Sequence, residues 1–227
     1  MAESINLPTT CKSLADWQRC YADASPSLNT FRRTFTALLR WAFSQANRID
    51  GFKDAIGCLT WSENEGKDQI YISSGSSADP GDTEQVPGII ISCDKQGVSL
   101  NRPWINSKGA ESPDTSSHNR VYVGKVTMQF TCMHFDADVA CIMADYVLLF
   151  ITALEQVIKE TFLWLLDYKP VNQTEPTLTQ KVQTEGASKW YESVVSLELD
   201  YEYAVFLARE SKRLKDFELV VDGAQEK

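Results

Sequence analysis

The chain has 227 residues, of which 43% are hydrophobic and 23% charged, the composition of an ordinary globular protein. It contains 22 Lys and Arg residues and 31 Asp and Glu residues, which gives a formal net charge of −9. This charge disfavours a surface that binds the phosphates of nucleic acids. Residues 1–20 contain no apolar stretch typical of a signal peptide, and the most apolar run, 146–154, is too short to span a bilayer. Six cysteines without a CxxC pair indicate reduced thiols, so we expect a protein made in a cytoplasm.

Two helices are predicted in the first fifth of the chain. Residues 13–23 predict a short helix with Ser13 as its cap, and residues 28–49 carry apolar side chains at three- and four-residue steps, which is typical of an amphipathic helix.

Candidate strands at 55–61 and 69–73 flank a polar segment and indicate a hairpin. An isoleucine-rich run at 87–94 indicates a buried strand.

The second half begins with a long alternating segment at 120–135, which predicts a half-buried strand with Lys125 on its polar face. From Val139 the apolar spacing becomes helical and predicts one helix that runs on to Trp164 or Leu165. Residues 168–188 contain two prolines and a glycine and are predicted as a long connection, like the polar loops at 74–85 and 106–119. Residues 193–209 alternate most clearly of all and predict a strand.

These elements predict the α+β class. We expect a largely antiparallel or mixed sheet of four to six strands packed against two main helices. The expected organisation is a single domain, 1–227, with an N-terminal extension (1–27), a core (28–209) and a C-terminal tail (210–227).

Five groups with ligand or catalytic chemistry fall within ten positions: Cys132, His134, Asp136, Asp138 and Cys141. A metal site and a Cys–His nucleophile are both conceivable, but the tight CxxC or HxxxH pairs typical of zinc are absent from the sequence. A strand that turns into a helix explains all five groups, with Asp136 as the helix N-cap and Asp138 in the first turn. The sequence also lacks GxxxxGK[ST], GxGxxG, GxSxG and HExxH. We therefore expect no catalytic residue, no cofactor and no metal.

Charged residues are concentrated in two further places. Glu198, Asp200 and Glu202 alternate along the last strand, so their carboxylates share one face, which is either solvated or lines a wet, negative surface. The basic cluster at 209–215 indicates a solvated face or a subunit contact rather than a nucleic-acid site.

The order of elements resembles that of the tail terminator and neck proteins of tailed bacteriophages over residues 28–206. The resemblance is carried by TCMHFDADVACIMADYVLLFITALEQVIKE, a strand that flows into a long helix, followed by the final strand VVSLELDYEYAV. In that family the strand ends in a short turn before the helix. The matching residues here are Phe135-Asp136-Ala137-Asp138, Ala140, Ile142, Ala144, Asp145 and Val147.

The resemblance implies a non-enzymatic virion protein that is assembled in the host cytoplasm. Such proteins form closed, usually hexameric, rings that end the tail tube and join it to the neck or connector, and viral DNA passes through them without specific binding. The resemblance implies no membrane, no cofactor, a lumen lined by Glu198, Asp200 and Glu202, and contacts made by the long loops. Three alternatives remain: a head-completion connector, a baseplate ring component, or a small cytoplasmic enzyme or ligand-binding domain whose pocket uses some of the six tryptophans.

Overall fold

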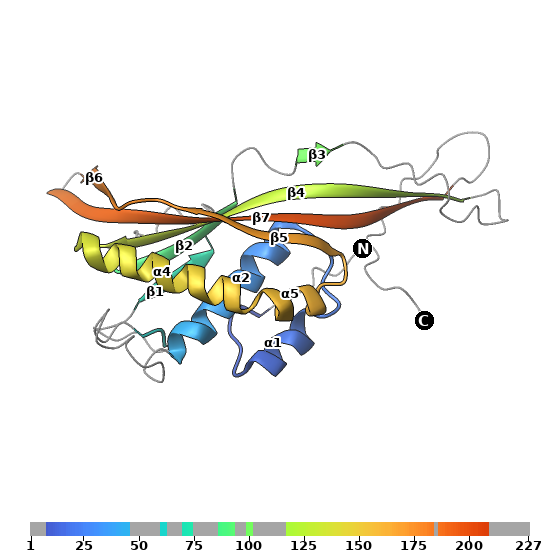
Figure 1. Cartoon of the computed structure of the whole chain (residues 1–227), viewed down its shortest axis with the longest axis horizontal. Coiled ribbons are helices and arrows are strands. Elements are labelled where there is room, and N and C mark those ends of the chain that lie inside the picture. Colours follow the sequence, from blue (N-terminus) through green and yellow to red (C-terminus); the bar gives the residue numbers. More distant parts are fainter. Residues whose placement is uncertain are drawn as a thin grey trace.

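Figure 1 shows the protein as a computed structural model, which describes residues 8–45, 60–62, 70–74, 86–93, 99–101, 117–183 and 186–208. Most of the predicted hairpin at 55–61 and 69–73 lies outside the described residues. So do the end of the helix predicted at 28–49, nearly all of both polar loops, and the C-terminal tail.

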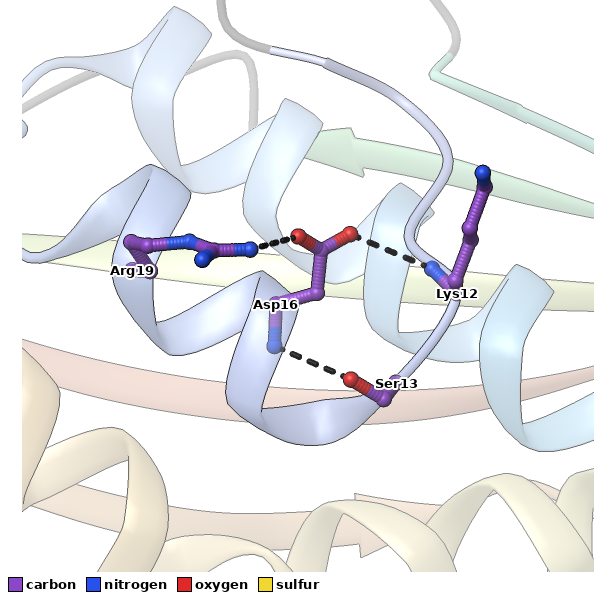
Figure 2. A network of polar contacts seen from close by, with 4 residues as sticks. All are labelled: Lys12, Ser13, Asp16 and Arg19. Atoms are coloured by element: carbon purple, nitrogen blue, oxygen red, sulfur yellow. Dashed lines mark hydrogen bonds and ion pairs between the residues drawn. The ribbon is translucent and has the colours of Figure 1, made fainter.

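The described helices are α1 (Leu14–Tyr21), α2 (Leu28–Ser44), α4 (Ala137–Ala153) and α5 (Glu155–Thr161). Both N-terminal helices begin where the sequence predicts. The Ser13 hydroxyl accepts a hydrogen bond from Asp16 N at 3.1 Å, and the Ser27 hydroxyl accepts one from Thr30 N at 3.0 Å. Asp16 also accepts hydrogen bonds from Arg19 Nη2 at 2.7 Å and from Lys12 N at 3.4 Å (Figure 2). The hydrogen bond from Arg19 holds the pKa of Asp16 below its usual value.

All described strands belong to one seven-stranded mixed sheet: β1 (Tyr71–Ser74), β2 (Gly88–Cys93), β3 (Ser99–Asn101), β4 (Ser117–His134), β5 (Leu165–Gln173), β6 (Thr177–Gln183) and β7 (Gly186–Ala208). The order is β1-β2-β4-β7-β5, while β3 pairs with β4 and β6 pairs with β7. Only the β1–β2 pairing is parallel among the described strands. The predicted α+β class with a mixed sheet is confirmed.

The four helices lie on one face of the sheet, and the core fills the space between the two layers (Figure 1). Aromatic rings form much of this core: Trp17, Phe31, Phe35, Phe130, Phe162 and Trp164. Arg40 of α2 also ties the helix layer to the sheet, because its Nε and Nη2 donate to the Ile72 carbonyl of β1 at 3.1 and 2.7 Å.

Strands β4 and β7 form a ribbon that extends beyond the helices (Figure 1). They pair without interruption from Ser117↔Ala208 to His134↔Tyr191. The six pairs from Ser117↔Ala208 to Tyr122↔Tyr203 have no third strand beside them among the described strands. We call residues 117–122 and 203–208 the arm.

Two sequence predictions are wrong between residues 139 and 188. The expected single helix breaks at Leu154, and α5 continues from α4 at a bend of 49°. Residues 168–188 are not a connection without strands, because they contribute most of β5, all of β6 and the start of β7. β5 is irregular, with register shifts at 165/167 and 170/172, so its sequence shows no regular alternation. With β5 and β6 the sheet has more strands than the four to six expected.

No single described helix is long and apolar enough to cross a membrane. The bent pair α4 and α5 passes such a test together, by length and composition only. The buried residues of α4 pack against the sheet, which accounts for much of its apolar character.

Candidate functional surface

The junction between β4 and α4 holds the five groups that the sequence brings close together. Cys132 is fully buried in the core, and this burial raises the pKa of its thiol far above the usual value. His134 Nδ1 accepts a hydrogen bond from Asp136 N at 2.9 Å, so this nitrogen is engaged by the backbone of the turn. The junction therefore contains an unreactive, buried thiol and a histidine whose hydrogen bond stabilises the turn before α4.

Asp136 is the N-cap residue of α4, as the sequence predicts. Its Oδ1 accepts hydrogen bonds from Asp138 N at 2.8 Å and from Val139 N at 3.3 Å. These two amides have no partner inside the helix, so the carboxylate satisfies both and also places negative charge at the positive end of the helix dipole.

We expect Asp136→Ala to lower the free energy of unfolding by about 1 kcal/mol, because both amides lose their acceptor. Asp136→Asn is the matched control, since its amide oxygen keeps the acceptor position, and it should cost much less. Urea denaturation followed by circular dichroism measures both values. An equal loss in the two variants would show that the capping hydrogen bonds contribute little.

Cys141 lies on α4 and takes part in a polar contact with the β5 edge rather than in a metal site. Burial, with the nearby Asp145 carboxylate, raises the pKa of its thiol. Gln173 Nε2 of β5 donates to Asp145 Oδ1 at 2.8 Å. Within the described ranges, no three His, Cys, Asp or Glu side chains come together in a way that would hold a metal ion.

The three predicted carboxylates of β7 lie on the face of the sheet that no described helix covers. Val195, Leu197, Leu199 and Tyr201 alternate with them and are buried against the helices. Glu198 and Glu202 are exposed, while Asp200 is half-buried. The strand alternation predicted from the sequence therefore brings Glu198, Asp200 and Glu202 together on one accessible surface, which we call the open sheet face.

Two lysines moderate the charge of the open sheet face. Lys125 Nζ of β4 lies 3.2 Å from Asp200 Oδ2, an ion pair across neighbouring strands. Lys169 of β5 is the register partner of Glu198, and residues directly opposite in an antiparallel pair share a face. Asp167 stands opposite Asp200 in the same way. Four carboxylates against two ammonium groups leave this part of the face net negative.

Sequence reasoning placed Lys125 on the polar side of its strand but missed Lys169 and Asp167. Both lie in β5, around a segment predicted as a connection. The signal in the sequence was weak, because the register shifts in β5 disturb the alternation that would mark a strand.

The middle of the open sheet face is uncharged and mainly polar, with Ile90 and Val194 beside Thr131 as its apolar members. Thr127, Gln129 and Thr131 of β4 are all half-buried, and Gln129 stands opposite Ser196 of β7 and Ser92 of β2. Such a face offers hydroxyl and amide groups along its centre and carboxylates toward the arm. It is suited to contact with water or with a polar surface rather than to packing in a core.

Comparison of the chain with known protein families finds no match, and comparison with curated proteins finds none either.

Proposed function

We propose that the protein is a non-enzymatic structural component of a tailed bacteriophage virion. In this proposal it forms a ring at the head–tail junction, ends the tail tube and joins it to the neck or connector. The sequence resemblance suggests this role. The observation that carries it is the separation of the two sheet faces, with all described helices on one side and the net negative, polar open sheet face on the other (Figure 1).

A ring with its open sheet faces inward would present Glu198, Asp200 and Glu202 to the lumen. Each phosphate of DNA carries a negative charge, so carboxylates at the wall disfavour adhesion and let the duplex slide. Lys125 and Lys169 reduce this repulsion without reversing it. The helix layer would then face outward, where neighbouring tail and neck proteins make their contacts.

Native mass spectrometry over a concentration series tests the ring. The expected species has a mass near six times 25.5 kDa, and electron microscopy of the same sample should show a central channel. A head-completion connector or a baseplate ring component would also give a closed ring, and binding to purified tail tubes separates the terminator from both. A strict monomer that binds a small molecule in a ligand screen would favour the enzyme or ligand-binding alternative.

Glu198→Lys tests the orientation of the open sheet face in the ring. The substitution changes the charge by two units per subunit on a face that we place in the lumen, so we expect the variant ring to retain DNA while the wild-type ring does not. This retention should fall steeply with added salt, as phosphate contacts do. Fluorescence anisotropy with a labelled duplex at low and high salt measures it.

The matched control is Glu175→Lys, which makes the same charge change at an exposed residue between β5 and β6. Gln173, two residues earlier, donates to Asp145 Oδ1 of α4 at 2.8 Å, so this end of β5 lies close to the helix layer. DNA retention in both variants alike would contradict an inward-facing open sheet face.

A further inference from the structure

Six large apolar side chains are exposed among the described residues. They are Phe135, Leu149, Leu163, Leu166, Val171 and Leu178. All six belong to the turn before α4, to α4, to the α5–β5 region or to β6, and within the described ranges none lies on α1, α2, β1 or β2. Apolar side chains that are exposed singly are ordinary on protein surfaces, so only a group of them indicates a contact surface.

The most exposed of these side chains borders a groove at the bend between α4 and α5. Leu163 is 81% exposed. It lines an open groove of about 700 Å³ together with Thr152 and Ala153 of α4 and with Glu155, Gln156, Lys159 and Glu160 of α5. Leu149, which is 55% exposed, lies one helical turn before Ala153. We call Leu149, Ala153 and Leu163 the bend patch.

The polar rim of the groove is already arranged by hydrogen bonds within α5. Lys159 Nζ lies 2.7 Å from Glu155 Oε1, and Gln156 Nε2 donates to Glu160 Oε1 at 2.9 Å. These contacts hold the carboxylates of Glu155 and Glu160 in place beside Leu163. With Lys159 paired to Glu155, the groove carries one net negative charge beside Leu163, which suits an occupant that combines apolar side chains with positive charge.

The end of α4 nearest the bend contributes two residues to the bend patch. Among its 17 residues only Asp138 and Asp145 are charged. One face packs on the sheet through residues such as Met143 and Val147, and a helix with only one buried face normally carries polar residues over most of the other. The exposed residues of α4 are Asp138, Asp145, Leu149, Thr152 and Ala153, so its outward side departs from this pattern only at Leu149 and Ala153, near the bend.

The arm is the second surface of this chain that has no cover among the described elements. Its two strands of six residues each extend for about 20 Å at roughly 3.4 Å per residue. Eight of those twelve residues are apolar and Arg120 is the one charged residue. A two-stranded ribbon is marginally stable in water by itself, so a ribbon of this composition is expected to pack against another surface.

The arm of a chain runs away from the bend patch of the same chain. It continues the sheet layer past α5 and away from the helices, as Figure 1 shows. Its strands are held in that direction by continuous pairing with the body of the sheet. A bend patch is therefore accessible to the arm of another copy but not to its own.

We propose that the arm of one copy docks on the bend patch of a second copy. The charges of the sequence agree with this pairing, because β7 leads directly into residues 209–215, which contain four basic residues and one acidic residue. On the accepting side, Glu155, Lys159 and Glu160 line the groove and leave one net negative charge, and Asp145 is exposed on α4. The arm would then make apolar contacts with the bend patch, and attraction between the basic residues of 209–215 and these carboxylates would orient it.

The two docking surfaces are different parts of the chain, so the contact is heterologous. Each copy then donates one arm and accepts one, and such contacts close into a ring when the rotation between neighbours allows it. The role of this contact in closing a ring rests on the proposed function. The contact between two copies does not depend on the proposed function.

The first test replaces the bend patch leucines by charge in the double variant Leu149→Glu/Leu163→Glu. We expect the apparent dissociation constant between copies to rise at least about tenfold in native mass spectrometry. Both side chains are exposed, so circular dichroism and the thermal midpoint should stay close to wild type. Leu178→Glu is the matched control, since Leu178 is 53% exposed on β6, and it should leave assembly unchanged.

The second test identifies the occupant directly. A photoreactive amino acid at position 163 is activated in a mixture of isotopically labelled and unlabelled full-length chains. Mass spectrometry should find crosslinks between copies to residues 117–122 or 203–208. Crosslinks confined to the same copy, crosslinks to any other segment of the second copy, or a strict monomer at every concentration would overturn the inference.

These outcomes separate the inference from the proposed function. A dimer with crosslinks from position 163 to the arm would support the docking contact and contradict the ring. A closed ring whose crosslinks fall elsewhere would support the ring and contradict the arm as the occupant. Equal loss of assembly in the double variant and in Leu178→Glu would also overturn the inference, because the effect would then not be specific to the bend patch.

Discussion

Replacing Trp17 by alanine should lower the free energy of unfolding by about 3–5 kcal/mol. Trp17 has no exposed surface, and its ring stacks on Tyr21 at 5.5 Å and meets Phe162 edge-on at 5.8 Å between ring centroids. Its Nε1 donates to the Thr34 carbonyl of α2 at 3.3 Å. The substitution therefore opens a cavity between α1, α2 and the end of α5 and also removes a buried hydrogen bond. Urea denaturation monitored by circular dichroism measures the loss.

Arg19→Ala is the control on the same helix. Arg19 is exposed and pairs with Asp16 on the surface (Figure 2), where such pairs contribute little. Its removal should leave the unfolding midpoint almost unchanged. Similar, small losses in both variants would show that α1 is peripheral to the fold.

The packing of Trp17 bears on the organisation of the chain. The sequence divides it into an extension at 1–27 and a core at 28–209, yet Trp17 and Tyr21 of α1 belong to the buried core. The Tyr21 hydroxyl donates to the Pro8 carbonyl, and Arg40 Nη1 donates to the Thr9 hydroxyl at 3.0 Å, so residues before α1 are also anchored. A helix of only eight residues gives too short a pattern to reveal such contacts.

Elements with a regular period were predictable from the sequence. The strands at 87–94, 120–135 and 193–209 correspond to β2, β4 and β7, and the helices at 13–23 and 28–49 to α1 and α2. Each has enough uninterrupted alternation or helical spacing for its buried face to be identified. β5 was missed because two register shifts and Pro170 break its pattern, and a proline is tolerated there because β5 has β7 on one side only among the described strands.

The chemistry of the candidate surface was predictable only where it depends on one element. Strand alternation alone places Glu198, Asp200 and Glu202 together, and the residue before α4 identifies Asp136 as the cap. The ion pair between Lys125 and Asp200 depends on the register between β4 and β7, and the position of Lys169 depends on β5. Register between strands far apart in the sequence is set by the whole sheet, so no local pattern reports it.

The bend patch shows the same limit. The sequence predicts one continuous helix that passes through Leu154 and runs on to Trp164 or Leu165. In the structure the helix breaks at Leu154, and α5 follows at an angle of 49° and ends at Thr161. Leu163 lies just after α5 and is exposed to solvent. No proline or glycine marks the break in the sequence, so the exposed groove follows from tertiary packing rather than from a local stop signal.

Replacing Gly124 by alanine should lower the free energy of unfolding by about 1–3 kcal/mol, the usual cost of overpacking a core. A Cβ atom at position 124 would lie 2.5 Å from Tyr201 Cζ and 2.8 Å from its hydroxyl oxygen. Tyr201 is the cross-strand partner of Gly124, and its ring covers the glycine. It is also held from the other side by Phe31 and Trp164, at 5.2 and 6.2 Å between ring centroids, so it cannot move aside without cost.

A double-mutant cycle separates this clash from other effects of the substitution. In a Tyr201→Leu background the crowding ring atoms are gone, so Gly124→Ala should cost much less there than in the wild-type chain. The four free energies come from urea denaturation of the four proteins. A cost that is the same in both backgrounds would mean that the Tyr201 ring is not what excludes a side chain at position 124. Gly124 and Tyr201 form a pair close to the start of the arm. A confirmed coupling would therefore show that the Tyr201 ring, packed over Gly124, stabilises the sheet where the arm begins.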